Sequence, residues 1–347
     1  MAWWNTFFGI FNRKKPVSLA NLEGKSYVNS ALGNLVLENK VPGISVTILR
    51  GGKVYLQKGY TNNNLQQEAI EPERSMFRIA SISKCITGLA FGKMVEQGLV
   101  SWDDSFYKHV PDYPKKKYDF TLRQLASHTA GIRSYKGKEY AWNKPWEIAE
   151  SITFFKDDPL VFEPGKGYLY NSLDFVLLAI ALQNAAKMPF EDYVSKEILT
   201  PLEMHQTKSP RKVVDTVPFF TRCGLSFRAA SEVDNYYKLA GGGYLSTSAD
   251  IVKLGQELLQ QTILKPETYK ELLTAQVVNG KSTYYGLGFQ VSQDVLGRNY
   301  VGHIGNSVGA YSNLFVYPEQ QLVAVLLTNC TDPKVQPIWD DILTKIA

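Results

Sequence analysis

Two short runs rich in β-branched and aromatic residues stand near the start of the chain. They cover residues 43–50 (GISVTILR) and 53–60 (KVYLQKGY), and Gly51-Gly52 lies between them. Two glycines allow the positive φ angles that tight hairpin turns need. The pattern therefore predicts a β-hairpin.

From Ser83 the pattern changes to that of a helix. Apolar residues occur on most sides of the segment through Val95, and Gly98 follows where a C-terminal cap is expected. A helix that is apolar on most sides is a buried one. We therefore expect a buried helix that begins at Ser83.

The rest of the chain divides into a helical middle and a C-terminal third rich in strands. Residues 101–235 combine short helical patterns with loops rich in Pro, Lys and Tyr, and we expect the lysine run 115–117 on a solvated surface. Strands are predicted at 300–304, 310–317 and 322–329, and a closing helix at 335–346. Strands at both ends with helices between them indicate one sheet assembled from distant segments. Because we find no repeat or linker, residues 16–347 are expected to form a single domain.

Composition and charge exclude several classes of protein. The 347 residues contain 38 Lys plus Arg and 33 Asp plus Glu, a net charge of +5, which is too mild for a nucleic-acid-binding protein. A hydrophobic content of 44% with 20% charged residues is that of a globular chain, so disorder and fibrous repeats are excluded. The longest apolar run, residues 175–182, is far shorter than the ~20 residues of a membrane-spanning helix. Three cysteines without a C-x-x-C pair predict neither a disulfide framework nor a zinc site.

The first fifteen residues form a separate amphipathic arm. Its aromatic residues recur at helical spacing, and three basic residues follow them: Trp3, Trp4, Phe7, Phe8 and Phe11, then Arg13, Lys14 and Lys15. A secretory signal has the reverse order of charge and apolar core, so we predict no cleavable signal and favour a cytoplasmic or peripheral-membrane location over a periplasmic one. Two interpretations stay open for the arm: a helix at a lipid surface, or a helix that packs on protein.

The sequence Ser81-Ile82-Ser83-Lys84 places a serine and a lysine three residues apart at the start of the buried helix. At this spacing both side chains project from one face. A serine hydroxyl becomes a nucleophile when a neighbour takes its proton, and a lysine can do so where burial or positive charge lowers its pKa. Alone the motif is weak, because a serine that caps a helix explains it equally well.

Six motifs together make the assignment specific. They are FRIASISKCIT (77–87), LASHTAGI (125–132), EPG (163–165) with YNS (170–172), GGGYLSTSAD (241–250), YGLGF (285–289) and GHIGNSVG (302–309). In this order and spacing the chain resembles the serine β-lactamase-like and penicillin-binding-protein-like hydrolases, in the branch of class C β-lactamases, esterases and D-amino-acid peptidases. The resemblance covers about residues 30 to 346. It specifies fold and family more closely than substrate.

The resemblance implies the catalytic roles. Ser81 would be the acylated nucleophile, Lys84 the adjacent base or proton shuttle, and Tyr170 a phenol that faces the nucleophile from the helical lobe. The third residue of this tyrosine motif is Ser172 where the family pattern has Asn. A hydroxyl can still donate one hydrogen bond to a substrate or to Lys84, but it lacks the paired groups of an amide.

The same resemblance places the substrate-binding residues on a strand. His303-Ile304-Gly305 replaces the Lys-Thr-Gly of the β-lactamases, a variant that the esterases and D-peptidases share. Gly305 suits a close approach of substrate to the strand. The resemblance puts the oxyanion hole at the backbone N–H groups of Ser81 and Asn306. From spacing alone, His303 is more often a half-buried sheet histidine satisfied by a neighbouring group, and this alternative stays open. An imidazole with an ordinary pKa of ~6.5 is mostly neutral at pH 7 to 8 and can donate or accept one hydrogen bond.

Other polar residues receive a structural assignment. His128 in LASHTAGI titrates in the right range for a base, but we expect it to hold a loop through backbone hydrogen bonds. We find no metal-ligand cluster and no nucleotide fingerprint, and therefore expect no cofactor.

The implied fold is an α/β sandwich. An antiparallel sheet from about 16–75 and 238–347 is flanked by helices, with a mostly helical lobe at about 76–237 inserted between its halves. The favoured function is a serine hydrolase that forms an acyl-enzyme on a small-molecule ester or amide, esters having the better leaving group. Two alternatives stay open: a true β-lactamase or D-alanyl peptidase, and a non-catalytic descendant that binds a ligand or partner. The sequence leaves the natural substrate and the oligomeric state undetermined.

Overall fold

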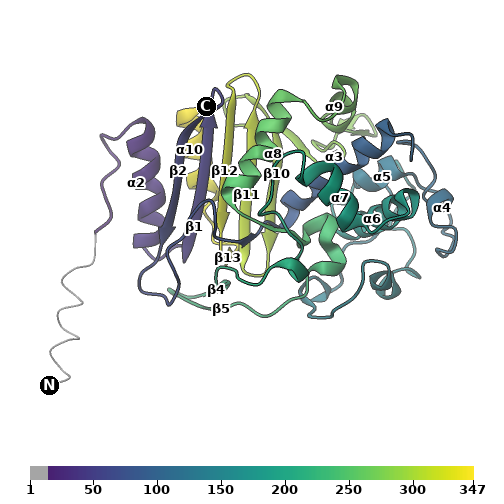
Figure 1. Ribbon diagram of the computed structural model, residues 1–347, viewed down its shortest axis with the longest axis horizontal. Coiled ribbons are helices and arrows are strands. Elements are labelled where there is room, and N and C mark those ends of the chain that lie inside the picture. Colours follow the sequence, from purple (N-terminus) through teal and green to yellow (C-terminus); the bar gives the residue numbers. More distant parts are fainter. Residues whose placement is uncertain (1–14) are drawn as a thin grey trace.

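Figure 1 shows the computed structural model, which describes residues 15–347. A six-stranded antiparallel sheet forms its centre, with the strand order β2-β1-β12-β11-β10-β9. The strands are β1 (Gly43–Arg50), β2 (Lys53–Thr61), β9 (Gln290–Gln293), β10 (Asn299–Ser307), β11 (Ala310–Tyr317) and β12 (Leu322–Thr328). β1 pairs with β12 from Ile44 opposite Thr328 to Arg50 opposite Leu322. The expected antiparallel sheet, built from both ends of the chain and flanked by helices, is confirmed.

Side chains of the central strands alternate between two cores, one on each face of the sheet. On β1, Val46 belongs to a core shared with α2 (Gly24–Leu37) and α10 (Gln336–Ile346). The adjacent Thr47 faces the opposite way, and its hydroxyl lies 2.8 Å from Ser248 Oγ at the start of α8 (Ser248–Gln260). Figure 1 shows α2 and α10 on one side of the sheet and α8 on the other. Strands covered on both faces are buried throughout, which explains their nearly continuous apolar character.

Most of the predicted elements occur where the pattern placed them. The hairpin turn uses Gly51 and Gly52 with φ of 56° and 73°, and the buried helix is α3 (Ser83–Glu96), followed by Gly98 at φ 70°. No predicted element covers residues 16–42, where the structure has α2. This helix contains glycines and asparagines of low helix propensity, and its buried face against the sheet supplies the stability.

The helical lobe packs against the β10 side of the sheet (Figure 1). Its helices are α3, α4 (Phe106–His109), α5 (Leu122–Ala126), α6 (Leu173–Ala186) and α7 (Phe190–Val194), with α9 (Pro266–Leu272) beside α3. Single 3₁₀ turns lie at Ala80–Ile82, Glu139–Ala141, Glu150–Phe154, Pro210–Lys212 and Tyr236–Lys238, and π turns at Ser195–Leu199 and Leu239–Gly243. Of the predicted surface lysines, Lys116 is half-buried instead, because its ammonium donates hydrogen bonds to the carbonyls of Lys156 and Asp158.

Three small sheets complete the structure. The first pairs β3 (Phe77–Arg78) with β6 (Leu245–Ser246), the second joins β4 (Phe220–Cys223), β5 (Ser226–Ala229) and β13 (Cys330–Thr331), and the third pairs β7 (Val277–Val278) with β8 (Lys281–Ser282). The β3–β6 pair holds the segment before Ser81 against the segment that leads into α8.

Two expectations concern membranes. Within residues 15–347 no single helix is long and apolar enough to cross one, and α6 with the segment 190–199 reaches that length only as a pair bent by 78°. Except for Lys15, the amphipathic arm predicted for residues 1–15 lies outside the described residues.

Candidate active site

Ser81 lies in a single 3₁₀ turn, Ala80–Ile82, between β3 and α3. The residue before it, Ala80, has φ 45°, a left-handed conformation that costs an L-residue roughly 1–3 kcal/mol. Two side chains fix this backbone: Ser83 Oγ donates to the Ala80 carbonyl at 2.7 Å, and Ser312 Oγ donates to the Ile79 carbonyl at 2.7 Å. The turn is therefore tied to both α3 and β11, and Ser81 has a fixed position at the junction of sheet and helical lobe.

Lys84, one turn further along, is completely buried. Its Nζ lies 3.2 Å from Ser81 Oγ, 2.6 Å from the Gly241 carbonyl oxygen and 3.4 Å from Ser172 Oγ. No carboxylate within residues 15–347 forms an ion pair with it. Burial, which penalises the charged form, is the largest cause that lowers the pKa of Lys84 to about 7. A large fraction of this amine is therefore neutral near pH 7 and able to accept a proton.

Tyr170 approaches Ser81 from the loop before α6. Its phenol donates a hydrogen bond to Ser81 Oγ at 2.7 Å, and its ring lies 4.8 Å from Lys84 Nζ. Desolvation raises the pKa of Tyr170, so the phenol carries its proton at neutral pH. The ring is 37% exposed, so this face of the site is open to solvent. Ser81 thus has a proton acceptor on one side and a proton donor on the other.

His303 lies on β10 and differs from the expectation. It is almost fully buried, and both ring nitrogens are engaged within the protein: Nδ1 lies 2.6 Å from the Ile304 carbonyl oxygen and Nε2 lies 2.9 Å from Tyr285 OH. A carbonyl oxygen only accepts, so Nδ1 carries the proton and Nε2 accepts from Tyr285. Burial lowers the pKa of His303 to about 3, well below the ordinary value assumed from the sequence. The imidazole is neutral, and its contact with a substrate stays a prediction.

Gly305 and Asn306 follow on the same strand. A Cβ on Gly305 would lie 2.3 Å from Ser312 Oγ and 2.7 Å from the Ile79 carbonyl oxygen, so the glycine lets β10 approach the turn that carries Ser81. Asn306 is exposed beside it. The oxyanion hole formed by the N–H groups of Ser81 and Asn306, and the substrate-binding role of Gly305, stay predictions.

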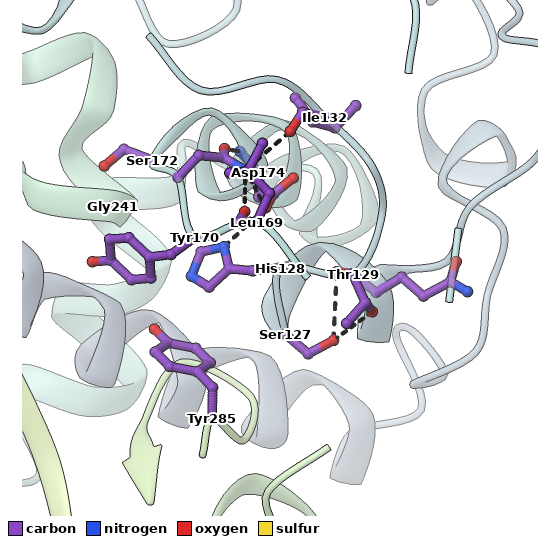
Figure 2. Close-up of polar contacts among 12 residues, drawn as sticks. Ser127, His128, Thr129, Ile132, Leu169, Tyr170, Ser172, Asp174, Gly241 and Tyr285 are labelled. Carbon is purple, nitrogen blue, oxygen red and sulfur yellow. Dashed lines mark hydrogen bonds and ion pairs between the residues drawn. The ribbon is translucent and has the colours of Figure 1, made fainter. Parts of the chain in front are cut away.

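The structure adds residues to which the sequence analysis gave no role in the site. Figure 2 shows His128 between Tyr170, Tyr285 and Asp174. His128 Nδ1 lies 2.8 Å from Asp174 Oδ2, and the His128 carbonyl accepts a hydrogen bond from Leu169 N at 3.0 Å. The expected loop-holding backbone bond is present, but the imidazole contacts a carboxylate 46 residues away. Tyr285 belongs to one of the six sequence motifs, whereas no local sequence pattern indicates a role for Asp174.

The described residues offer no obvious metal site. Residues 15–347 contain no group of three or more His, Cys, Asp or Glu side chains that could hold an ion.

Fold and site together define the class of the protein. An antiparallel sheet covered by helices, with a Ser-x-x-Lys turn between β3 and α3 packed beside Gly305 of β10 and a tyrosine from the helical lobe, is the β-lactamase and penicillin-binding-protein arrangement. The chain belongs to the Beta-lactamase family, whose model matches residues 28–345.

Similar proteins differ in what their names describe. The chain is 27% identical to the serine beta-lactamase-like protein LACTB, mitochondrial, of Homo sapiens, over 85% of this chain and 71% of that protein. It is 24% identical to Protein flp of Staphylococcus aureus strain N315, over 94% of this chain and 67% of that protein. Among solved structures, D-amino acid amidase from Ochrobactrum anthropi SV3, complexed with L-phenylalanine amide, superimposes with a TM-score of 0.78 at 19% identity. That match covers 92% of this chain and 98% of the amidase. At this identity the amidase shows the shared fold alone.

Proposed function

We propose that this chain is a serine hydrolase that forms an acyl-enzyme at Ser81 and acts on esters or small amide or peptide substrates. One observation carries the proposal: Ser81 Oγ lies 3.2 Å from the Lys84 amine and 2.7 Å from the Tyr170 phenol. A nucleophile with a base on one side and an acid on the other is the arrangement that acyl transfer needs.

The hydrogen bonds around a neutral Lys84 are mutually consistent. Its two N–H groups donate to the Gly241 carbonyl and to the Ser172 hydroxyl, and its lone pair is left for the proton of Ser81. Tyr170 meanwhile donates to Ser81 Oγ. Lys84 is thus oriented by the backbone of the π turn 239–243 and by Ser172, which stands where the family pattern has asparagine.

Acylation follows from this arrangement. Ser81 Oγ forms a bond to the substrate carbonyl carbon as its proton passes to Lys84 Nζ. When the bond to the alcohol breaks, the alcohol oxygen takes the proton of Tyr170, and the proton held by Lys84 restores the phenol. The predicted N–H donors of Ser81 and Asn306 would stabilise the intermediate oxyanion by several kcal/mol, as such donors do in comparable sites.

Deacylation uses the same groups in reverse order. Water adds to the acyl carbon and gives a proton to the Lys84–Tyr170 pair. The bond between Ser81 Oγ and the acyl carbon then breaks, and the pair returns the proton to Ser81 Oγ. The net reaction is ester plus water to acid plus alcohol. Esters are the first substrate choice, because an alkoxide is a better leaving group than the nitrogen anion of an amide.

The alternatives fit the site less well. A β-lactamase or D-alanyl peptidase would place a cation against the substrate carboxylate, and the residue at the lysine position of the β-lactamases is the neutral, buried His303. A non-catalytic ligand-binding descendant has no need for Lys84 and Tyr170 to converge on Ser81.

Covalent labelling tests the proposal. The wild-type chain and Ser81→Ala are exposed separately to a fluorophosphonate, a penicillin and a panel of short-chain p-nitrophenyl esters, and intact mass and hydrolysis are measured. We expect one added fluorophosphonate on the peptide that holds Ser81, ester turnover, and neither in Ser81→Ala. Labelling or ester hydrolysis that survives Ser81→Ala would overturn the assignment.

A further inference from the structure

The mechanism above leaves one buried polar pair unused. His128 and Asp174 have 0% and 1% of their surface exposed, and they contact each other through Nδ1 and Oδ2 at 2.8 Å. Among the described residues His128 Nε2 and Asp174 Oδ1 have no hydrogen-bond partner. Buried polar groups are costly to maintain, so a pair of this kind next to a reactive site calls for a reason.

Hydrogen bonds link His128 and Asp174 to Leu169 and Asn171, the residues immediately before and after Tyr170. On one side, Leu169 N donates to the His128 carbonyl at 3.0 Å. On the other, Asn171 Nδ2 donates to Asp174 Oδ2 at 2.7 Å and to the Leu169 carbonyl at 2.9 Å. Both neighbours of Tyr170 are therefore tied to His128 or Asp174, whereas within residues 15–347 the phenol itself hydrogen-bonds only to Ser81. The backbone position of Tyr170 depends on this network.

The imidazole also contacts the Tyr170 side chain directly. Its ring centroid lies 4.5 Å from that of Tyr170 in an edge-on arrangement and 4.8 Å from that of Tyr285 (Figure 2). The edge-on contact restricts the tilt of the phenol ring. Since Asp174 fixes one nitrogen of the imidazole, the ring contact has a defined direction.

A role for His128 as a proton carrier conflicts with its surroundings. Burial is the main cause that lowers its pKa well below the ordinary value, and the charged forms of Lys84 and His303 would act in the same direction. Burial raises the pKa of Asp174. The imidazole therefore stays neutral through the working pH range and serves through its shape and its one hydrogen bond.

We propose that His128 is a positioning residue: held by Asp174, it fixes the phenol of Tyr170 against Ser81 and affects the reaction only through Tyr170. This inference rests on the proposed function. His128 itself reaches neither the nucleophile nor a substrate, and Tyr170 makes the contact.

The first variant separates the ring from its hydrogen bond. In His128→Asn, the amide nitrogen occupies the place of Nδ1 and can still donate to Asp174, and asparagine tolerates the positive φ of 63° at this position. The rest of the imidazole, which packs edge-on against the Tyr170 ring, is lost. We expect kcat for the best ester to fall about 10- to 100-fold, the scale of an ångström-sized misplacement, with KM changed less than kcat.

A double-mutant cycle with Tyr170→Phe provides the decisive readout. If His128 acts through the phenol, His128→Asn lowers kcat in the wild-type background and by less than about twofold in Tyr170→Phe. A general structural role would cost the same factor in both backgrounds. Equal losses, or a wild-type kcat in His128→Asn, would overturn the proposal.

Three further variants keep the result interpretable if a change disturbs folding. Asp174→Asn retains an oxygen that accepts from His128 and Asn171 and should keep most of the rate, whereas Asp174→Ala should resemble His128→Asn. Ser127→Ala alters a buried residue of the same loop whose hydroxyl bonds to Arg123 O and Thr129, and it should leave kcat near wild type. Urea unfolding of each variant shows that the folded state is populated in the assay. An Asp174→Asn chain as slow as Asp174→Ala would contradict positioning by hydrogen bond.

The outcomes also separate this inference from the proposed function. If Ser81→Ala abolishes turnover but the cycle shows independent losses, only the positioning role of His128 fails. If Ser81→Ala remains active, the proposed function itself fails.

Discussion

Replacing Lys84 by methionine should make the folded chain more stable near neutral pH, although it removes the proposed base. Lys84 is fully buried, and burial lowers its pKa from 10.5 to about 7. Between these two values the unfolded chain binds a proton that the folded chain does not bind, so protonation favours unfolding. The free energy of unfolding therefore rises with pH over this window and is lowest, for this group, below pH 7.

The size of the effect follows from the pKa difference. With a folded pKa of about 7 and an unfolded pKa of about 10.5, the lysine destabilises the folded state by about 4 kcal/mol at pH 7 and by about 1 kcal/mol at pH 9.5. Methionine removes this penalty but leaves the Gly241 carbonyl without its donor, which costs about 1–3 kcal/mol at either pH. Lys84→Met should thus gain about 1–3 kcal/mol at pH 7, and the gain should shrink by about 3 kcal/mol at pH 9.5.

Urea unfolding at the two pH values measures this difference directly. Groups that titrate alike in both proteins cancel when the two free energies of unfolding are subtracted. The same measurement on Lys93→Met, which removes a partly exposed lysine from the same helix, provides a matched control. If the difference between Lys84→Met and wild type varies by less than about 1 kcal/mol from pH 7 to pH 9.5, the pKa of Lys84 is not lowered by burial and the reasoning fails.

Four further outcomes test the site and the arm. For wild type, kcat/KM for an ester should rise with pH along one limb with an apparent pKa near 7, where Lys84 loses its proton. A flat profile from pH 5 to 8 would count against Lys84 as the base. Lys84→Met and Tyr170→Phe should each lower kcat by about 10² to 10⁴-fold, and the double variant by less than the product, because the two move one proton; strictly multiplicative losses would indicate independent roles. Tyr285→Phe leaves His303 Nε2 buried without a donor and should cost about 1–3 kcal/mol in urea unfolding, so an unchanged unfolding free energy would contradict that bond. Deleting residues 1–15 should leave ester hydrolysis nearly unchanged. If only the full chain cosediments with anionic vesicles, the arm binds a lipid surface. If both chains sediment equally, the arm packs on protein.

Local patterns were sufficient to predict much of the fold. Runs of β-branched residues bounded by turn residues predict the hairpin at 43–60 and the strands at 310–317 and 322–329. The pairing of β1 with β12 is not a local property, and the prediction of one sheet from both ends rested on element order and on the family resemblance. α2 was not predicted, because the helix is stabilised by packing against the sheet, and the local sequence of residues 24–37 carries no sign of that contact.

The candidate site divides in the same way. Ser81 and Lys84 lie one turn apart on the same chain segment, so their proximity follows from helical geometry. His128 and Asp174 are 46 residues apart and meet only after folding. The residue type at position 303 is evident from the sequence, but its burial is not. Burial keeps the His303 imidazole neutral, and the fold places Ile304 and Tyr285 against its two nitrogens.

One physical cause sets the charge of three bases around Ser81. Lys84, His128 and His303 each have at most 1% of their surface exposed, and burial is the largest cause that lowers the pKa of all three. Lys84 starts highest, so it is the group that remains able to take a proton near pH 7, whereas both imidazoles stay neutral. A charge on either histidine would lower the pKa of Lys84 further and weaken it as an acceptor. In the proposed mechanism, positive charge would therefore arise at Lys84 as negative charge develops on the substrate oxygen.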